Sequence, residues 1–564
     1  MKVVIVGGVA GGASAAARLR RLDESADIVM IERTGYVSYA NCGLPYFVGG
    51  EITDRKRLTL QTPDSFLSRF NVDVRVNSEV IAIDRPGKMV RVCNLVDGSE
   101  YDESYDRLIL SPGARPIIPD MPGVDDPRVM TLRTVEDTLR MHGFIQSNAP
   151  KRAVVCGGGY IGLEIADNLH ALGIEVTIVQ RPDHVLPQVD REMAADVHHH
   201  IRSKGVDLRL SDAVVGFDTD GPLTVLLRSG ERIETDMSVV ALGVSPDTQL
   251  AKDAGLDLGI KGSIVVDEHL RTSDPDIYAV GDAIQVKNAI TGAYANIALA
   301  GPANKQGRIV ANNIVGIDST YEGSMGPSVL RVFDMTVGAT GLTEKQAKDA
   351  GYDVEKVYTY SASHATYYPG AKNMSVKTIF DRSSGKILGA QIVGYGGVDK
   401  RIDVIATAIR AGMTVYDLEE LELSYAPPYS SAKDPVNYAG FVATNLLSGL
   451  VKQYHWDELD ARVSDPNMTV VDLRTSAEYA EQHLDGVLHI PVDELRERLS
   501  EIPKNKPVSV FCHSGLRSYL GCRILMQNGY DCSHMAGGFR FYASVVKDLN
   551  IGSPEDYPCG IKRS

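Results

Sequence analysis

Cys42 is the first of two cysteines whose neighbours suit redox chemistry. It lies in the run Ser38-Tyr39-Ala40-Asn41-Cys42-Gly43-Leu44-Pro45-Tyr46. An internal redox disulfide needs a second cysteine a few residues away, but the position five residues on is Phe47. If Cys42 is redox-active, its partner must therefore be a small molecule. The bond would be a mixed disulfide, a persulfide, or an oxygen adduct such as a sulfenic acid.

Cys512 is the second such cysteine, and it opens the loop Cys512-His513-Ser514-Gly515-Leu516-Arg517-Ser518. The run 508–511 before the loop predicts a buried strand, and a helix is expected after it. Successive backbone N–H groups, the helix N-terminus and Arg517 would stabilise a thiolate and an added sulfur anion. Four residues separate Cys512 from Arg517, whereas cysteine phosphatases need five to admit a phosphate. The short loop favours sulfane sulfur.

The N-terminal residues predict a strand, a glycine-rich turn, a helix and a second strand. The expected ranges are 3–6 for the first strand, 13–22 for the helix and 27–31 for the second strand. The turn Gly7-Gly8-Val9-Ala10-Gly11-Gly12 departs from G-x-G-x-x-G at Val9. It still permits a tight turn and a helix N-terminus aimed at a pyrophosphate, and Glu32 is placed to accept from a ribose hydroxyl pair.

A second copy of this pattern begins at Ala153, so two dinucleotide sites are predicted. Strands are expected over 153–156 and 176–179, and the fingerprint is complete at Gly157, Gly159 and Gly162. Gln180 stands where a ribose-binding acid is expected, and Arg181 follows. Glutamine does not repel a 2′-phosphate, and Arg181 can pair with one or be a solvated surface residue. NADH, NADPH and dual use all stay open.

Length, charge and cysteine content narrow the class of protein. A chain of 564 residues predicts several domains, and a net charge of −15 argues against a general nucleic-acid or anionic-membrane binder. Neither a secretory signal nor an apolar run that could cross a bilayer is expected. Seven cysteines without a CxxC pair argue against a disulfide framework or zinc site and favour a reducing cytoplasm.

The remaining cysteines and a run of histidines are expected to be structural. No metal is predicted, because the adjacent His198, His199 and His200 would face different directions on a helix. Cys156 ends a predicted buried strand, and the cysteines without ligand-like spacing are Cys93, Cys522, Cys532 and Cys559.

Two further segments resemble motifs of flavoprotein disulfide reductases. They are Leu108-Ile109-Leu110-Ser111-Pro112-Gly113 and Thr272-Ser273-Asp274-Pro275-Asp276-Ile277-Tyr278-Ala279-Val280-Gly281-Asp282. With nucleotide motifs flanking Cys42, the first 445 residues resemble the single-cysteine pyridine nucleotide–disulfide oxidoreductases. The Asn-Cys-Gly-Leu-Pro-Tyr string resembles coenzyme A disulfide reductases and the related persulfide reductases. The resemblance implies FAD, NADH or NADPH, and coenzyme A bound as substrate or as a mixed disulfide at Cys42.

The resemblance also implies which residues bind the cofactors. Asp282 would hydrogen-bond the ribityl chain of FAD. The implied FAD contacts are Gly7, Gly8, Ala10, Gly11, Gly12, Glu32, Arg33, Asn41, Val80, Ser111, Pro112, Gly113, Gly281, Asp282 and Ala298. The implied contacts of the nicotinamide coenzyme are Gly157, Gly159, Tyr160, Ile161, Gly162, Glu164, Gln180, Arg181 and Gly243.

A site for coenzyme A follows from the same resemblance. Its contacts would be Ser14, Arg18, Arg21, Ser38, Tyr39, Asn41, Asn304 and Lys433. Arg18 and Arg21 share a helix face and could form either a phosphate clamp or a solvated basic stripe. Tyr367 and Tyr425 match tyrosines that reach into the partner's active site of a homodimer. Their phenol protons would stabilise a departing thiolate, although the tyrosines could equally be interface aromatics.

The C-terminal part of the chain follows the rhodanese pattern. A strand is expected over 470–474, and the pattern continues at Glu478-Tyr479, His483, Gly486 and Ile490-Pro491 before the Cys512 loop. A degenerate, structural rhodanese domain would usually lack the cysteine, so Cys512 argues for activity.

These patterns predict an α/β protein with two Rossmann-like nucleotide-binding domains of the glutathione-reductase type, an α+β dimerisation domain and an α/β rhodanese domain. The expected ranges are 1–112 and 246–325 for the FAD-binding domain, 113–245 for the NAD(P)-binding domain, 326–447 for the dimerisation domain, 448–456 for a linker and 457–564 for the rhodanese domain.

The predicted function is NAD(P)H-dependent reduction of coenzyme A persulfide, polysulfide or disulfide by a cytoplasmic homodimer. The candidate catalytic residues are Cys42, Cys512, Tyr367, Tyr425 and Arg517. Three alternatives stay open. They are a coenzyme A disulfide reductase that serves a thiol buffer, an NADH oxidase or peroxidase that uses a Cys42 sulfenic acid, and a sulfurtransferase whose flavin portion only regulates.

Overall fold

The computed structural model describes residues 1–551, which form two compact units. The first unit comprises residues 1–185 and 206–326, and the second comprises residues 186–205 and those from 327 onward. Cys559 and the end of the predicted rhodanese range lie outside the described residues.

The first unit begins with a parallel five-stranded sheet in the order β18-β7-β1-β2-β3. Its strands are β1 (Lys2–Val6), β2 (Asp27–Ile31), β3 (Asp73–Arg75), β7 (Arg107–Leu110) and β18 (Ile277–Ala279). Helix α1 (Ala10–Leu22) joins β1 to β2, as predicted. It starts earlier than the predicted residue 13, because the Ala13 N–H already bonds the Val9 carbonyl at 2.9 Å.

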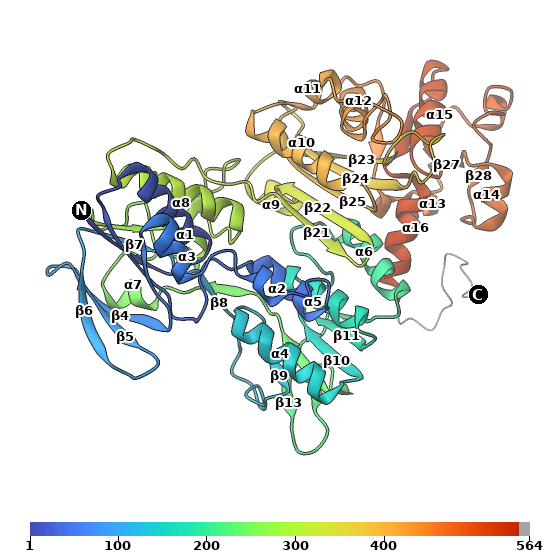
Figure 1. Cartoon of the computed structure of the whole chain (residues 1–564). Helices are drawn as coiled ribbons and strands as arrows, with labels where there is room; N and C mark the ends of the chain where they lie inside the picture. The colour runs from blue at the N-terminus through green and yellow to red at the C-terminus, as the bar shows by residue number, and fades with distance from the viewer. Residues whose placement is uncertain (552–564) are drawn as a thin grey trace. The chain divides into compact units, whose positions relative to one another are not determined.

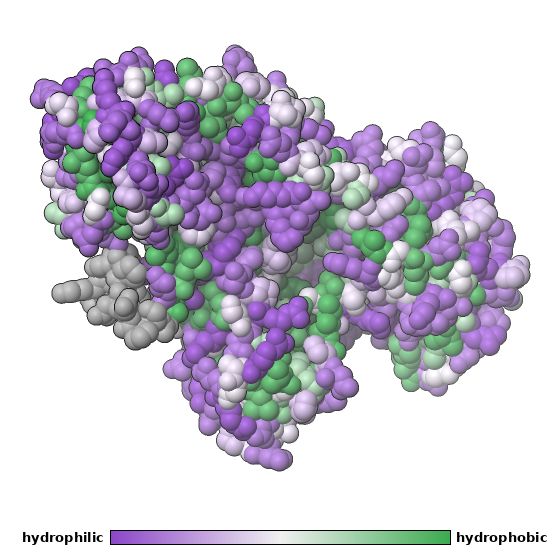
Figure 2. Space-filling view, turned by 180° about the vertical axis from the view of Figure 1, so that it is seen from behind, coloured by the Kyte–Doolittle hydropathy of each residue, from purple (hydrophilic) through white to green (hydrophobic). Residues whose placement is uncertain are grey.

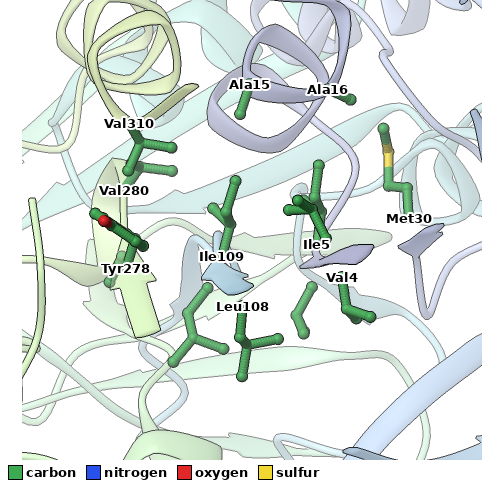
Figure 3. Packing of buried hydrophobic residues seen from close by; sticks show 14 of the residues in the cluster. Val4, Ile5, Ala15, Ala16, Met30, Leu108, Ile109, Tyr278, Val280 and Val310 are labelled. Carbon is green, nitrogen blue, oxygen red and sulfur yellow. The ribbon is translucent and has the colours of Figure 1, made fainter. Parts of the chain in front are cut away.

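The core of this sheet explains why its strands are almost wholly apolar. Val4 and Ile5 of β1 lie beside Leu108 and Ile109 of β7, with helices packed above them (Figure 3). Parallel strands covered by helices are buried on both faces, so polar residues are excluded from them. Helices α1 and α8 (Ala300–Ile314) lie side by side (Figure 1). A Cβ added at Gly307 would lie 2.4 Å from the Gly11 carbonyl oxygen, so glycine permits this close packing.

The second nucleotide sheet is also parallel, in the order β12-β11-β10-β16-β9. Its strands are β9 (Val129–Met130), β10 (Arg152–Cys156), β11 (Glu175–Gln180), β12 (Asp207–Leu210) and β16 (Met237–Val240). Helix α5 (Tyr160–Ala171) follows β10 directly. The two strands predicted here are confirmed; each starts one residue earlier than predicted, and β11 also ends one residue later.

Antiparallel strands and further helices complete the first unit. The strands are β4 (Ser78–Asp84), β5 (Met89–Asn94), β6 (Glu100–Ser104), β8 (Ala114–Pro116), β13 (Val214–Asp218), β14 (Thr224–Leu227), β15 (Arg232–Glu234), β17 (Val244–Pro246), β19 (Val286–Lys287) and β20 (Tyr294–Ala295). The helices are α2 (Leu44–Val48), α3 (Pro63–Phe70), α4 (Val135–Asn148) and α7 (Gln249–Asp253).

The second unit contains an antiparallel sheet in the order β21-β22-β25-β24-β23. Its strands are β21 (Ser328–Val332), β22 (Met335–Gly341), β23 (Val354–Ala362), β24 (Asn373–Asp381) and β25 (Ile387–Gly394). Helices α10 (Val398–Arg410) and α12 (Pro435–Leu447) pack against it. The shorter helices α9 (Glu344–Asp349) and α11 (Val415–Glu420) lie in the connections.

The C-terminal sheet of the second unit is parallel, in the order β26-β30-β29-β27-β28. Its strands are β26 (Gln453–Tyr454), β27 (Thr469–Asp472), β28 (Leu488–His489), β29 (Val508–Phe511) and β30 (Cys532–Met535). Its helices are α13 (Leu459–Ser464), α14 (Ser476–Glu481), α15 (Leu516–Gln527) and α16 (Gly538–Leu549).

Two details of this sheet bear on the sequence predictions. Strand β29 has the predicted range. Strand β27 ends at Asp472, two residues before the predicted end, because the buried Asp472 carboxylate accepts from the backbone N–H and the guanidinium of Arg474.

The segment 448–456, predicted to be a linker, contains β26, which pairs with β30 of the C-terminal sheet.

Helix α6 (Arg191–Ser203) belongs to the second unit and packs against α16. The fully buried Asp548 carboxylate accepts from Arg191 at 2.6 Å, His198 at 2.7 Å and Arg202 at 2.7 Å. Burial alone would raise the pKa of Asp548, but the His198 hydrogen bond and the arginine charges hold that pKa well below its usual range. The carboxylate is therefore ionised at neutral pH and ties α16 to α6.

We expect Asp548→Asn to destabilise the fold by about 3 kcal/mol at pH 7, since breaking a buried ion pair leaves charges uncompensated. A carboxyl group with a lowered folded-state pKa contributes its stability above its unfolded pKa and loses it as pH falls. The difference in the free energy of unfolding between the wild-type protein and the variant should therefore become smaller below about pH 4. Thermal unfolding of both proteins at several pH values measures this.

Asp531→Asn is the matched control, because Asp531 forms an exposed ion pair with Lys452 at 2.7 Å. Such surface pairs contribute at most about 1 kcal/mol. Equal destabilisation by the two substitutions would contradict the role given to Asp548.

None of the helices in residues 1–551 is long and apolar enough to cross a bilayer. On the face shown in Figure 2, hydrophilic residues predominate and hydrophobic residues form small groups.

Candidate active site

The first phosphate loop, between β1 and α1, has the shape that a dinucleotide requires. Gly7 has a φ of +95°, and an added Cβ would lie 2.1 Å from the Ser111 carbonyl oxygen. A Cβ at Gly12 would lie 1.9 Å from the Gly7 oxygen. The Gly12 N–H donates to Ser111 Oγ at 3.1 Å. Only glycine fits these positions, and the loop lies at the carboxyl end of β1, where α/β sheets bind nucleotides.

Glu32 lies beside this loop, at the end of β2. Its Oε2 accepts from the Gly8 N–H at 2.8 Å, and its Oε1 accepts from the Thr34 N–H and hydroxyl at 2.9 Å. The residue is buried, and its carboxylate lies beside the loop, where it could accept hydrogen bonds from the ribose diol of a bound dinucleotide.

Further predicted FAD residues follow strands of the first nucleotide sheet: Arg33 follows β2, and Gly281 and Asp282 follow β18. Gly281 has a φ of +81° and donates its N–H to Gln306 at 2.7 Å. Burial raises the pKa of the neighbouring Asp282, and the charge of Arg133 opposes this. Arg33 pairs with Asp247 at 2.7 Å. Val80 is buried on β4. The loop therefore fits FAD.

The second phosphate loop repeats the geometry of the first. Gly157 has a φ of +115°, and an added Cβ would lie 2.3 Å from the Ala241 oxygen. A Cβ at Gly162 would lie 1.9 Å from the Gly157 oxygen. A Cβ at Gly159 would meet nothing within 4 Å, so this glycine leaves the approach to the helix N-terminus open. The loop fits the pyrophosphate of a nicotinamide coenzyme.

Cys42 is exposed and lies in the 3-10 turn Asn41–Gly43, just before α2. Although its side chain reaches solvent, desolvation by surrounding atoms and the charges of Glu164 and Asp282 raise the pKa of the thiol. The charge of Arg133 lowers it. Glu164 comes from α5 behind the second loop, and Asp282 follows β18. The fold thus brings Cys42 close to predicted residues of both nucleotide sites.

A pocket of about 370 Å³ in the first unit brings together five of the predicted coenzyme A contacts. These are Ser14, Arg18, Arg21, Ser38 and Asn304. Ser14 Oγ donates to the side-chain oxygen Oδ1 of Asn304 at 2.5 Å, and Arg18 Nε donates to Oδ1 of Asn312 at 3.0 Å. Desolvation and the charges of Arg308 and Arg21 lower the pKa of Arg18. Because Arg18, Arg21 and Arg308 line one pocket and repel one another, the pocket favours binding of an anion.

The other predicted coenzyme A contacts do not line this pocket. Tyr39 is buried, and burial raises its pKa to about 12. Asn41 lies in the turn that carries Cys42. Lys433 belongs to the second unit, as do Tyr367 and Tyr425. The two tyrosines are exposed, and their hydroxyl groups lie 2.5 Å apart.

Cys512 lies at the end of β29, in a loop that leads into α15. Cys512 is fully buried, and its sulfur accepts a hydrogen bond from the Gly515 N–H at 3.1 Å. Gly515 has a φ of +108°, which turns its N–H toward the sulfur. Ser518 Oγ lies 3.5 Å from the same sulfur. The loop can therefore stabilise a thiolate with backbone donors.

Arg517, predicted to add positive charge beside Cys512, is paired with Glu478. Its two terminal nitrogens donate to the two carboxylate oxygens at 2.7 Å each. These bonds lower the pKa of Glu478 to about 2, so the pair is ionised at neutral pH. Arg517 is thereby held in one orientation next to the loop.

The three adjacent histidines of α6 contact three different groups. His198 bonds Asp548, His199 bonds the Ser544 carbonyl oxygen at 2.8 Å, and His200 lies 3.0 Å from Asp334. A nearby acidic trio, Asp190, Glu192 and Glu344, has metal-like spacing, but Lys377 Nζ lies 2.5–2.9 Å from all three.

Several residues of these sites were not predicted. The pocket is also lined by Gln61, Phe66, Phe70 and Arg308. Arg308 lies four residues after Asn304, so one helix face carries both, and this spacing could have pointed to it. No local pattern links α3, which carries the two phenylalanines, to α1.

The chain belongs to the pyridine nucleotide-disulphide oxidoreductase family. The family model covers residues 1–307, its dimerisation domain covers residues 327–435, and a rhodanese-like domain covers residues 455–544. These matches confirm the predicted fold class. The protein is accordingly an FAD- and NAD(P)H-dependent flavoprotein reductase with a C-terminal rhodanese domain.

Particular relatives narrow this class. The reduced CoADR-RHD of Bacillus anthracis is 49% identical, with a TM-score of 0.95 over 97% of this chain and 98% of that chain. A NAD-dependent persulfide reductase from A. fulgidus is 39% identical, with a TM-score of 0.90 over 96% of this chain and 100% of that chain. A coenzyme A disulfide reductase of Staphylococcus haemolyticus is 35% identical over 79% of this chain and all of its own length.

Proposed function

We propose that the protein reduces coenzyme A persulfide, and also coenzyme A disulfide, with electrons from NAD(P)H. The observation that carries the proposal is the arginine-lined pocket, whose wall includes Ser38, four residues from the exposed Cys42 thiol. A nucleotide held in this pocket could extend its thiol arm toward Cys42. The names of the relatives support this substrate.

The pocket suits the nucleotide part of coenzyme A. Arg18, Arg21 and Arg308 offer fork-shaped donors to phosphate oxygens. The rings of Phe66 and Phe70, with centroids 5.7 Å apart, offer an aromatic surface for adenine.

Cys42 is the proposed nucleophile. Its thiolate attacks the sulfur that is bonded to the carbon of coenzyme A persulfide. A Cys42–coenzyme A disulfide forms, the persulfide S–S bond breaks, and hydrosulfide leaves with the electron pair. FAD, held by the loop that contains Gly7 and Gly12, would supply the two electrons that NAD(P)H provides. With these electrons and one proton, the mixed disulfide gives the Cys42 thiolate and coenzyme A thiol.

The second unit contributes two further proposed roles. In a homodimer formed through the dimerisation domain, Tyr367 and Tyr425 would donate phenol protons to the departing thiolate. Cys512 would carry sulfane sulfur as a persulfide and transfer it to coenzyme A or to Cys42. The six described cysteines are free thiols, which supports a reducing cytoplasm as the setting.

The mass of the intact, non-reduced protein tests the identity of the thiol partner. We expect coenzyme A on Cys42, located by peptide mapping and released by NADH or NADPH. A bare or oxygenated Cys42 in a protein that also fails to bind coenzyme A would refute the proposal.

Arg21→Ala tests the pocket. We expect the KM for coenzyme A persulfide to rise about tenfold, since a charge-assisted hydrogen bond contributes about 1.5–3 kcal/mol and part of this is retained by Arg18 and Arg308. The kcat is expected to change little, and the effect should weaken at high salt. Steady-state kinetics at two ionic strengths measure both.

Arg69→Ala is the matched control, because Arg69 is exposed on α3 but does not line the pocket. A rise in KM of equal size in this variant would show that general surface charge, and not the pocket, attracts the substrate.

A further inference from the structure

The hydroxyl group of Ser518 lies near the Cys512 sulfur and has three possible partners. Ser518 belongs to the first turn of α15 and is fully buried. Its Oγ lies 3.5 Å from Cys512 Sγ, 2.9 Å from the Gly515 carbonyl oxygen and 3.4 Å from Nδ1 of His534. A hydroxyl group carries one proton, so it donates to one of these atoms at a time.

The ionisation of Cys512 changes which atom receives this proton. In the thiol state, the S–H group donates to Ser518 Oγ, and the Ser518 hydroxyl donates to the Gly515 oxygen. A thiolate accepts hydrogen bonds but donates none, so the hydroxyl can then rotate toward the sulfur. The Gly515 oxygen keeps a partner after this rotation, because the Tyr519 N–H also donates to it at 2.9 Å. The rotation therefore leaves this carbonyl group satisfied.

His534, the third partner, lies on β30 and is buried. Desolvation, with a smaller contribution from the charge of His455, lowers the pKa of His534 to about 4. The imidazole is therefore neutral at pH 7 and is a poor base for the Cys512 proton. A neutral imidazole carries one N–H group. With that proton on Nδ1, the ring donates to Ser518 Oγ while the hydroxyl donates to the thiolate.

We infer that His534 is a positioning residue for Cys512: its Nδ1–H group donates to Ser518 Oγ, and the Ser518 hydroxyl donates to the Cys512 thiolate. Each bond in such a chain polarises the next, which strengthens the final bond to sulfur. The Gly515 N–H, 3.1 Å from the sulfur, is the second donor to the thiolate. The inference rests on the proposed role of Cys512 as a sulfur carrier and adds a residue that sets the reactivity of this thiol.

The step that this chain of hydrogen bonds assists is the loading of Cys512. The Cys512 thiolate attacks a terminal sulfur of a polysulfide dianion, and an S–S bond of the polysulfide breaks. A dianion shorter by one sulfur leaves with the electron pair, and Cys512 becomes a persulfide anion. When a coenzyme A thiolate later attacks the outer sulfur, the Cys512 thiolate is the leaving group. The same two donors thus favour both loading and release.

Other titratable groups also lie near this chain of hydrogen bonds. They are Arg517 with its partner Glu478, His513, Tyr438, Tyr454 and His455. Substitution of Ser518 or His534 leaves all of these groups in place. A change in the reactivity of Cys512 in such variants therefore reports on the hydrogen-bonded chain and not on the surrounding charges.

The rate at which Cys512 reacts at different pH values tests the inference. The full-length, flavin-loaded protein is treated with iodoacetamide between about pH 6 and pH 10, and alkylation of Cys512 is followed by peptide mass. We expect Ser518→Ala to slow the reaction about tenfold at pH 7 and His534→Leu to slow it about threefold, because the thiolate is less well stabilised. Near pH 10 the rates should converge, since a cysteine ionises there without added donors.

Two further variants separate the hydrogen bond from the shape of the core. The δ nitrogen of asparagine is as many bonds from the backbone as Nδ1 of histidine, so His534→Asn should restore the wild-type rate. Ser533 is the neighbour of His534 on β30, and successive side chains of a strand point to opposite faces. Ser533→Ala should therefore leave the reaction of Cys512 unchanged. Thermal unfolding checks that each variant is folded.

The direction of the His534→Leu effect decides the outcome. A faster reaction at pH 7 would mean that Nδ1 accepts from Ser518 and draws the hydroxyl away from the sulfur, which would overturn the inference. An unchanged rate, or an equal slowing at pH 7 and pH 10, would overturn it too, because the effect would not act through the ionisation of Cys512.

Loading with inorganic polysulfide separates this inference from the proposed function, because peptide mass also measures the persulfide on Cys512. Equal loading rates in all variants would overturn the inference and leave the carrier role intact. The expected alkylation pattern without any persulfide would refute the carrier role and leave the hydrogen-bonded chain intact. A wild-type Cys512 that reacts with neither reagent would refute both.

Discussion

Replacing Cys42 by serine is expected to abolish sulfur reduction while leaving the flavin bound and reducible by NAD(P)H. Serine preserves the size of the side chain, but its hydroxyl group cannot form the mixed disulfide through which the substrate is reduced. We expect turnover on coenzyme A persulfide to fall by at least about 1000-fold, which equals about 4 kcal/mol of activation free energy.

Two measurements under anaerobic conditions check this expectation. Stopped-flow absorbance follows the bleaching of the flavin by NADPH, and a sulfide assay follows product release. Cys93→Ser is the control, because Cys93 is a half-buried thiol on β5. A Cys42→Ser protein that still releases sulfide at the wild-type rate would remove Cys42 from the reaction. Failure to bleach the flavin would show damage to the nucleotide sites instead.

The surroundings of Cys42 explain why one cysteine is enough. Its thiol is exposed, so a substrate can reach it from solvent. Desolvation and the carboxylates of Glu164 and Asp282 raise the pKa of the thiol, and the charge of Arg133 lowers it. Glu164 belongs to α5, which follows the second nucleotide loop, and Asp282 follows β18 of the first nucleotide sheet. The Cys42 thiol thus lies close to predicted residues of both nucleotide sites.

Local sequence patterns predicted the elements whose chemistry is repeated along the chain. The runs before Gly7 and Gly157 are continuous apolar stretches because both faces of each parallel sheet are buried. Glycine is required at Gly7, Gly12, Gly157 and Gly162, because a Cβ at each of these positions would overlap backbone atoms. The ability of the loop after Cys512 to stabilise a thiolate could also be predicted, because the donor to the sulfur is a backbone N–H only three residues away.

Contacts between residues far apart in the chain could not be predicted in this way. Phe66 and Arg308 meet in one pocket only because α3 and α8 both pack near α1. Glu478 and Arg517 form their ion pair across 39 positions. Helix α6 lies within the predicted NAD(P)-binding range, yet it belongs to the second unit, because Asp548 is buried against it. Such pairings depend on tertiary packing, which one local pattern does not encode.

Replacing Cys512 by serine is expected to separate two activities of the protein. Turnover on coenzyme A persulfide should stay near the wild-type rate, since that substrate already carries the sulfur that Cys42 displaces. Sulfide release from inorganic polysulfide in the presence of coenzyme A should fall by about 100-fold, about 2.7 kcal/mol, because the persulfide carrier is lost. The assay compares both substrates in the same preparation and subtracts the reaction of polysulfide with coenzyme A alone.

Ser514→Ala is the matched control for this loop, because Ser514 lies between Cys512 and Gly515, whereas the sulfur is contacted by the Gly515 N–H and by Ser518 Oγ. It should retain both activities. Equal loss of both in Cys512→Ser would contradict the division of labour and would mean that Cys42 receives sulfur only through Cys512. Retention of both would make the C-terminal domain peripheral to reduction. The expected result is loss of polysulfide use alone. Cys42 lies close to predicted residues of both nucleotide sites, whose cofactors would supply electrons, whereas the Cys512 sulfur accepts from a backbone N–H that can stabilise bound sulfur but cannot reduce it.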